Sequence, residues 1–151
     1  GKGAVMMKVG IEFDFVVPDS IEALELYEKI FDIERLGVTD FPRGENEAIF
    51  MLYGLRFHML DENPDFHLHA PKPDTSMHSW INVTVPSIKK TYEKTLDLGC
   101  TEIQPITRIE EMGISNAIFK DPYGYIWMLH EIHREVSQEE MMEFWEKHRE
   151  E

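Results

Sequence analysis

Alternating apolar and polar residues predict a β-strand near the start of the chain. Over residues 8–17 alternate positions are mostly apolar, whereas the positions between them include Glu12 and Asp14. A period of two is typical of a strand with one face on a core. Asp19 then opens a helical pattern of apolar residues that continues to about Phe31. We expect this helix to cover the apolar face of the strand.

Three short strand-like runs follow the helix. Turn-forming residues, notably Gly44 and Gly54, separate them, as expected between antiparallel strands. The runs comprise residues 34–41, 47–53 and 55–60. The pattern therefore predicts the order βαβββ for a module of residues 6–62.

The second half of the chain repeats this order. The segment that begins at Tyr53-Gly54 recurs with substitutions from Tyr123-Gly124. A repeat of this length indicates two similar supersecondary modules that each have an apolar face to cover. The second module is predicted at residues 77–133, and residues 63–76 are interpreted as the connector.

A C-terminal helix is predicted after the second module. Ser137 and Glu140 have the spacing of a capping box, and the helix is expected over residues 137–150. Its apolar side is expected to dock on the body of the protein or on a second subunit. That side comprises Met141, Phe144, Trp145 and His148.

Composition favours one compact domain over residues 1–151, since 42% of its residues are hydrophobic. The formal net charge of −14 repels phosphate and makes nucleic acid an unsuitable partner. No apolar run approaches the roughly 20 residues of a membrane span, and no signal-peptide pattern is visible, so a soluble, cytoplasmic protein is expected. Gly1 is interpreted as an expression remnant. Cys100 is the single cysteine, which excludes an intrachain disulfide and a thiolate metal cluster.

Several motifs occur in the order found in one known family. The segment from Val17 to Phe31 and the segment from Asp121 to Trp127 resemble those of the vicinal oxygen chelate superfamily, which contains glyoxalases, bleomycin-resistance proteins and extradiol dioxygenases. Residues 59–64 and 135–140 are similar to the PhnB-like branch. The resemblance implies an α+β fold in which two βαβββ modules form a curled, mixed or antiparallel sheet around a cavity. It also implies a homodimer.

The same resemblance implies four metal-ligand positions on the first and last strands of the modules. Glu12 and His58 occupy two of these positions and are competent ligands. Trp80 and Met128 occupy the other two, where neither suits the divalent zinc, nickel, manganese or iron that such a site would use. The expected metal site is therefore incomplete.

Alternation predicts which side chains face the cavity. A concave surface with an aromatic ring, a thioether and several polar groups is typical of a small-molecule pocket. Besides Glu12 and His58, the predicted ligand-binding residues are Asp14, Arg56, His78, Trp80, Asn82, Met128 and His130. A solvated sheet face is the alternative interpretation. His78 and His130 lie one rung from the missing ligand positions, so a non-standard metal centre is a further alternative.

Three functions are compatible with this pattern, of which the first is preferred to the third, and whether the protein is an enzyme stays open. The first is a metal-free enzyme for a small oxygenated or aromatic metabolite, with Glu12 and His58 as general base and acid. The second is a metal-dependent lyase, isomerase or dioxygenase. The third is a sequestering protein that binds its ligand, for example a cationic aromatic compound stacked on Trp80, without turnover.

Overall fold

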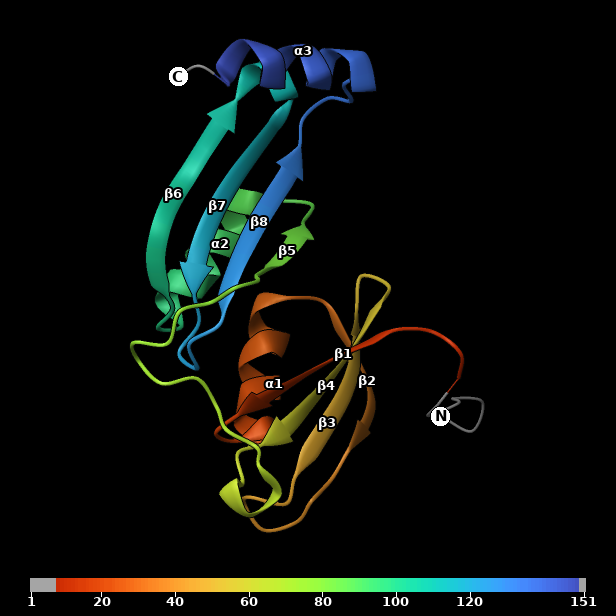
Figure 1. The fold of residues 1–151 in the computed structure, drawn as a ribbon, viewed down its shortest axis with the longest axis vertical. Coiled ribbons are helices and arrows are strands. Elements are labelled where there is room, and N and C mark those ends of the chain that lie inside the picture. The colour runs from red at the N-terminus through yellow and green to blue at the C-terminus, as the bar shows by residue number, and fades with distance from the viewer. Residues whose placement is uncertain (1–7, 150–151) are drawn as a thin grey trace. The chain divides into compact units, whose positions relative to one another are not determined.

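The structure, a computed structural model, describes residues 8–149 and contains two compact units, with the boundary between Thr75 and Ser76. Each unit has a four-stranded sheet and follows the order βαβββ (Figure 1). The predicted α+β fold of two such modules with mixed sheets is therefore confirmed. The cavity that the curled sheet is expected to surround stays a prediction. The predicted ends at residues 6 and 150, and the interpretation of Gly1, lie outside the described residues.

The first unit contains one four-stranded sheet and one long helix. Its elements are β1 (Glu12–Val17), α1 (Ser20–Ile30), β2 (Ile33–Val38), β3 (Glu47–Leu52), β4 (Leu55–Asp61) and the short 3₁₀ helix η1 (Pro64–Phe66). The strand order is β1-β4-β3-β2, with β1 parallel to β4 and the other pairs antiparallel. The parallel pair requires a crossover, which α1 and the two strands after it provide.

The second unit repeats this topology. Its elements are β5 (Ile81–Thr84), α2 (Ile88–Asp97), β6 (Thr101–Ile109), the 3₁₀ helix η2 (Glu110–Met112), β7 (Ile114–Lys120), β8 (Ile126–Ile132) and α3 (Gln138–His148). The strand order is β5-β8-β7-β6, and β5 runs parallel to β8.

The core of the first unit lies between its sheet and α1. Phe15 from β1 and Phe57 from β4 are buried there with Tyr27 of α1, and the rings of Phe50 and Phe57 stack with centroids 5.2 Å apart. These aromatic residues occupy the apolar set of alternating positions. Because neighbouring residues in a strand point to opposite faces, Glu12 and its neighbours of like phase face away from α1.

An acidic residue near the end of β4 and of β8 binds the start of each unit's helix. Asp61 Oδ1 accepts a hydrogen bond of 2.7 Å from the Ser20 amide, and Glu131 Oε1 accepts one of 3.0 Å from the Ile88 amide. Carboxylates are favourable at helix N-termini because the first amides lack partners within the helix. The repeat thus preserves the way in which each helix is anchored to its sheet.

Two strands begin later than the alternation predicts. β1 starts at Glu12 rather than at residue 8, and its partner at that point is Arg56, the second residue of β4. β5 starts at Ile81, opposite Trp127, the second residue of β8. In each unit the parallel pairing begins one residue after the start of the partner strand, and the residues before that point continue the alternation outside the paired region. Strand ends are set by the partner as well as by the pattern.

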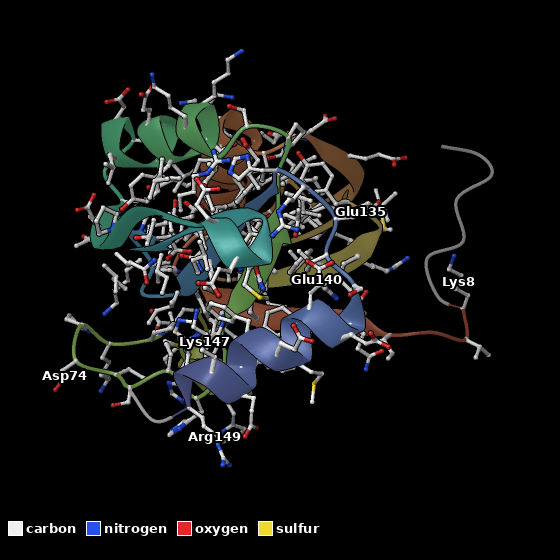
Figure 2. All side chains as sticks on the ribbon, turned by 90° about the horizontal axis from the view of Figure 1, so that it is seen from above. Lys8, Asp74, Glu135, Glu140, Lys147 and Arg149 are labelled. Carbon is white, nitrogen blue, oxygen red and sulfur yellow. The ribbon has the colours of Figure 1, made fainter. Side chains whose placement is uncertain are left out.

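The C-terminal helix α3 rests against η2 in its own unit. Lys147 lies 3.5 Å from Glu111, and Arg134 lies 3.4 Å from Glu140. Glu140 lies near the start of α3 and Lys147 near its end (Figure 2). The predicted capping box of Ser137 is present. The apolar side of α3 is not buried, since Trp145 remains 53% exposed. Docking of this side on a second subunit stays a prediction. None of the described helices has the length and hydropathy of a membrane span.

Candidate functional site

A cluster of ionisable side chains lies on the face of the first sheet that points away from α1. Parallel pairing of β1 with β4 sets Glu12 opposite Arg56 and Asp14 opposite His58. Cross-strand neighbours in a sheet lie close enough for their side chains to interact. The register therefore brings together four of the residues predicted from the sequence. Along the chain, Glu12 is 44 positions from Arg56 and 46 positions from His58.

Glu12 is the centre of this cluster. Its Oε1 lies 2.7 Å from Nε of Arg56, and its Oε2 lies 3.2 Å from Nδ1 of His58. The same imidazole nitrogen is 3.6 Å from Oδ2 of Asp14. His58 is only 17% exposed, whereas Asp14 is 51% exposed. The cluster is thus sheltered on the β4 side and open to solvent at Asp14.

Glu47 is a fifth member that the sequence pattern did not single out. It begins β3, and its Oε1 lies 3.0 Å from Nε2 of His58. A signal was available, because the apolar positions Ala48 and Phe50 face the core and leave Glu47 on the opposite face. Both ring nitrogens of His58 therefore lie next to carboxylates, and Glu47 fixes the orientation of the ring.

The two carboxylates on β1 have opposite pKa shifts. Hydrogen bonds with Asp14 and Arg56 lower the pKa of Glu12 to about 2, and His58 adds to this effect. Burial raises the pKa of Asp14, and the neighbouring negative charge of Glu12 raises it further. Two carboxylates this close repel each other when both are ionised. A cation between them offsets this repulsion and makes ionisation of both easier.

Glu12, Asp14 and His58 could hold a metal ion. Each offers one ligand atom, and these atoms all lie within 4.8 Å of one another. Carboxylate oxygens and an imidazole nitrogen suit zinc, manganese, iron or nickel. Asp14 enters this group from a position that the sequence pattern assigned to ligand binding rather than to a metal.

The predicted residues of the second unit form a separate and weaker constellation. His130 Nδ1 lies 2.6 Å from Oδ1 of Asn82, and burial lowers the pKa of His130. Met128 lies opposite Asn82 in the sheet. His78 and Trp80 precede β5 rather than belonging to it, and Trp80 is 59% exposed. The structure records no metal-capable group around His78 or His130 among residues 8–149.

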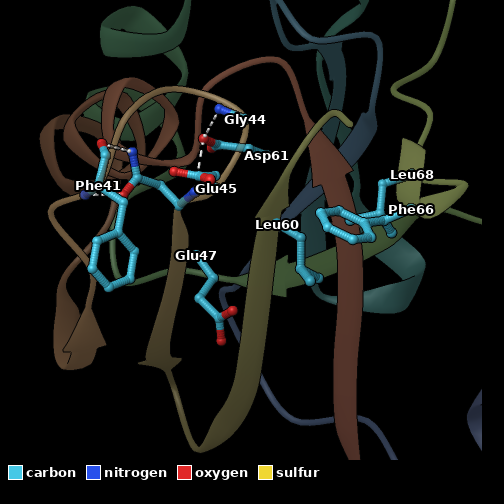
Figure 3. A pocket seen from close by; sticks show the side chains of 9 residues that line it. Phe41, Gly44, Glu45, Glu47, Leu60, Asp61, Phe66 and Leu68 are labelled. Atoms are coloured by element: carbon cyan, nitrogen blue, oxygen red, sulfur yellow. Dashed lines mark hydrogen bonds between the residues drawn. The ribbon is translucent and has the colours of Figure 1, made fainter. Parts of the chain in front are cut away.

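A cavity of about 570 Å³ opens in the first unit next to the cluster. Glu47 and Leu60 come from β3 and β4 and line it, with Phe41 from the β2–β3 loop and Phe66 from η1 (Figure 3). Phe41 is 59% exposed and Phe66 is 69% exposed. Because Glu47 also contacts His58, the cavity and the ionisable cluster are continuous. The volume suits a small molecule.

Asp61 holds the loop that forms one wall of this cavity. Its Oδ2 accepts hydrogen bonds from the amides of Gly44, at 2.8 Å, and Asn46, at 3.0 Å. Burial by itself raises the pKa of Asp61, but the amides of Ser20, Gly44 and Asn46 more than offset it, and the pKa lies below its ordinary value. Asp61 therefore stays ionised near neutral pH and links α1 to the cavity wall.

Comparison with known proteins gives a family match over most of the chain. Residues 11–129 match the Glyoxalase/Bleomycin resistance protein/Dioxygenase superfamily. The uncharacterized protein Rv0887c of Mycobacterium tuberculosis is 26% identical over 144 residues, which cover 91% of this chain and 83% of that protein. The uncharacterized protein Mb0911c of Mycobacterium bovis is also 26% identical over 144 residues, which cover 91% of this chain and 93% of that protein.

Solved structures of several differently named proteins share the fold. The fosfomycin resistance protein FosX from Listeria monocytogenes, solved with Mn(II) and sulfate, is 17% identical with a TM-score of 0.64 and covers 92% of this chain and 99% of that one. A glyoxalase/bleomycin resistance protein/dioxygenase family enzyme from Burkholderia phytofirmans is 11% identical with a TM-score of 0.62, and the match covers 80% of this chain and 96% of that one. At these identities the likeness shows the fold alone.

Proposed function

The chain belongs to the Glyoxalase/Bleomycin resistance protein/Dioxygenase superfamily, and we propose that it is a metal-dependent enzyme acting on a small oxygenated molecule. The observation that carries this proposal is the convergence of Glu12, Asp14 and His58, whose ligand atoms lie within 4.8 Å of one another beside a cavity. Glu12 and His58 occupy two of the four positions that the family resemblance assigns to metal ligands. Asp14 supplies a third donor.

The contacts within the cluster leave suitable atoms directed at a common point. Arg56 engages Oε1 of Glu12, while Oε2 faces His58. Glu47 engages Nε2 of His58, while Nδ1 faces Glu12 and Asp14. A histidine ligand is commonly held in place by a carboxylate on its other nitrogen. Arg56 and Glu47 therefore act as positioning residues, and Glu12, Asp14 and His58 as the ligands.

A metal-free role for Glu12 as general base receives less support. A carboxylate whose pKa is about 2 is a weak base at neutral pH, where an efficient proton acceptor has a pKa near the working pH. The same property suits a ligand, because the group is ionised over the whole physiological range. Glu12 is thus better adapted to holding a cation than to removing a proton.

The chemistry of the bound ion would be Lewis-acid polarisation of substrate oxygens. The chain itself contributes the negative charge of Glu12 and Asp14 and a fixed imidazole. The cavity next to Glu47 holds the rest of the substrate, with apolar surface from Leu60 and Phe66. FosX, which has the same fold, was solved with Mn(II), and this supports manganese as the first ion to test.

The experiment is a titration of chelator-treated protein with Mn(II) or Zn(II), followed by assays with and without chelator. Binding of about one ion per chain is expected, because the three donors form one group. Asp14→Asn and His58→Gln should each weaken binding by about tenfold or more. Glu34→Gln on β2 is the matched control and should leave binding unchanged. Glyoxalase, dioxygenase and fosfomycin-modifying assays then test turnover. Binding that is unaffected by the ligand variants would refute the proposed site.

A second candidate function is sequestration of a ligand without turnover. The observation that favours it is the cavity, whose two exposed phenylalanine rings offer a binding surface with no need of a metal. A sequestering protein binds its ligand stably and returns it unchanged after denaturation, whereas an enzyme releases a product. Mass spectrometry of the recovered ligand separates the two.

Branch, assembly and location are further parts of the proposal. The PhnB-like assignment rests on residues 59–64 and 135–140. A homodimer is supported by β1 and β5, since within residues 8–149 each pairs with one strand only and leaves an edge that a partner sheet could cover. Light scattering or sedimentation measures this directly. A cytoplasmic location rests on composition and stays a prediction.

A further inference from the structure

The cavity of the first unit is acidic as well as apolar. Its charged lining residues are Glu45, Glu47 and Asp61, and among the described residues no lysine or arginine lines it. Asp61 already accepts hydrogen bonds from three backbone amides. Glu45 and Glu47 remain as carboxylates that a ligand can approach, since Glu45 is exposed and the Glu47 side chain is 45% exposed.

The apolar part of the lining is unusually open to water. Phe41 and Phe66 lie on opposite sides of Glu47 and Leu60 (Figure 3). Large aromatic side chains are seldom this exposed unless a ligand or another protein surface covers them. A flat apolar group placed against these rings would remove them from water, and Leu60 and Leu68 would complete the contact.

We infer that this cavity takes a ligand with an aromatic or aliphatic body and a basic nitrogen. The body lies against Phe41 and Phe66, and the ammonium group lies at Glu47. Charge complementarity favours this class, because the lining is acidic and the whole chain carries a formal charge of −14. An ammonium group near aromatic rings gains further from cation–π attraction.

Glu47 gives this ligand a connection to the proposed active site. One carboxylate group would bind the ammonium and also contact Nε2 of His58, 3.0 Å away. Ligands of this class are then the substrates of the proposed enzyme. Only their reaction after binding rests on the proposed function. Occupation of the cavity itself requires no metal.

The test compares three probes of one shape: naphthylmethylammonium, naphthylmethanol and naphthoate. Each is titrated at low ionic strength with a chelator present, and amide chemical shifts are recorded by NMR. The ammonium probe should bind about tenfold more tightly than the alcohol, and naphthoate should bind most weakly. The largest shifts should occur at Phe41, Glu47 and Phe66.

Variants separate the two parts of the cavity. Glu47→Gln combined with Glu45→Gln should bring the ammonium probe to within about twofold of the alcohol, because the charge preference is lost. Phe41→Ala with Phe66→Ala should weaken both probes. Glu34→Gln is the control for charge outside the cavity and should change neither affinity.

Three outcomes would overturn the inference. These are equal binding of the ammonium and alcohol probes, a preference for naphthoate, or binding of all three that is weaker than about 10 mM. Since the chelator removes the metal, success or failure here is independent of the Mn(II) titration. Metal binding with no cation preference would leave the proposed enzyme standing and reject this substrate class.

Discussion

Asp61→Asn should destabilise the first unit strongly, although it only replaces one carboxylate oxygen by an NH₂ group. Asp61 is 1% exposed and connects three segments through backbone amides. Its Oδ1 accepts from Ser20, and its Oδ2 accepts from Gly44 and Asn46. Asparagine has only one side-chain oxygen, so its amide group must replace one of these acceptors and face a backbone N–H.

The magnitude is set by the hydrogen bonds that are lost. Whichever way the asparagine is turned, at least one bond to a charged acceptor disappears, which costs about 1.5–3 kcal/mol. A buried N–H left without a partner adds about 1–3 kcal/mol, and loss of the negative charge at the start of α1 adds about 0.3–1 kcal/mol. Allowing for relaxation of the loop, we expect a loss of about 3 kcal/mol.

The assay is urea unfolding followed by circular dichroism at pH 7. With a slope of about 2 kcal/mol per molar urea, the midpoint should fall by about 1.5 M. Hydrogen exchange at the Ser20 and Gly44 amides should accelerate first, because those groups lose their acceptor. Asp40→Asn changes an exposed carboxylate and serves as the control. A midpoint within about 0.3 M of the parent protein would refute the reasoning.

The pH dependence provides an independent check. The pKa of Asp61 in the folded protein lies below its ordinary value, so its stabilising contribution is fully present above the ordinary pKa and is lost as the pH falls through the lower, folded value. The difference between the parent protein and Asp61→Asn should therefore be constant near neutrality and shrink below about pH 4. A difference that grows under acid conditions would contradict this assignment.

Three further predictions concern the second unit. Burial and the hydrogen bond to Glu102 raise the pKa of Tyr92, so ultraviolet titration should show at least one tyrosine that keeps its proton until the protein unfolds, and stability should fall above about pH 10 as the unfolded state ionises; a complete native titration near pH 10 would contradict this. Burial raises the pKa of Cys100 to about 12, so Ellman's reagent should react slowly with native protein and rapidly in urea; equal rates would show an accessible thiolate. Trp127→Phe removes the hydrogen bond of 2.9 Å from Nε1 to Asp121 and leaves space in the core, so urea unfolding should report a loss of about 2–4 kcal/mol, and a loss below about 0.5 kcal/mol would contradict the packing argument.

Alternation along β1 correctly predicted which of its side chains share a face of the sheet. Phe13 and Phe15 lie on one side of the strand, and Glu12 and Asp14 on the other, because side-chain direction in a strand depends on the backbone alone. The sequence could not reveal the register that places Asp14 opposite His58. Register depends on which strands pair and where the β3–β4 hairpin turns.

Other parts of the site had no regular sequence signal. The cavity is formed by Phe41 in a loop and Phe66 in η1, where the chain follows no period that would show which side chains converge. The prediction that Trp80 lies on a strand and faces a cavity depended on alternation that continues beyond the end of the sheet. In the structure Trp80 precedes β5 and is exposed.

The most direct test of the proposed function is the location of bound Mn(II) in isotope-labelled protein. A paramagnetic ion broadens the NMR signals of nuclei close to it. We predict that the signals of Glu12, Asp14 and His58 broaden first, at less than one equivalent. Asp14→Asn should require about tenfold more Mn(II) for the same broadening, while Glu34→Gln should leave it unchanged. Broadening centred on Glu139 and Glu140, the acidic residues in the first turn of α3, or no site-specific broadening, would contradict the proposed metal centre.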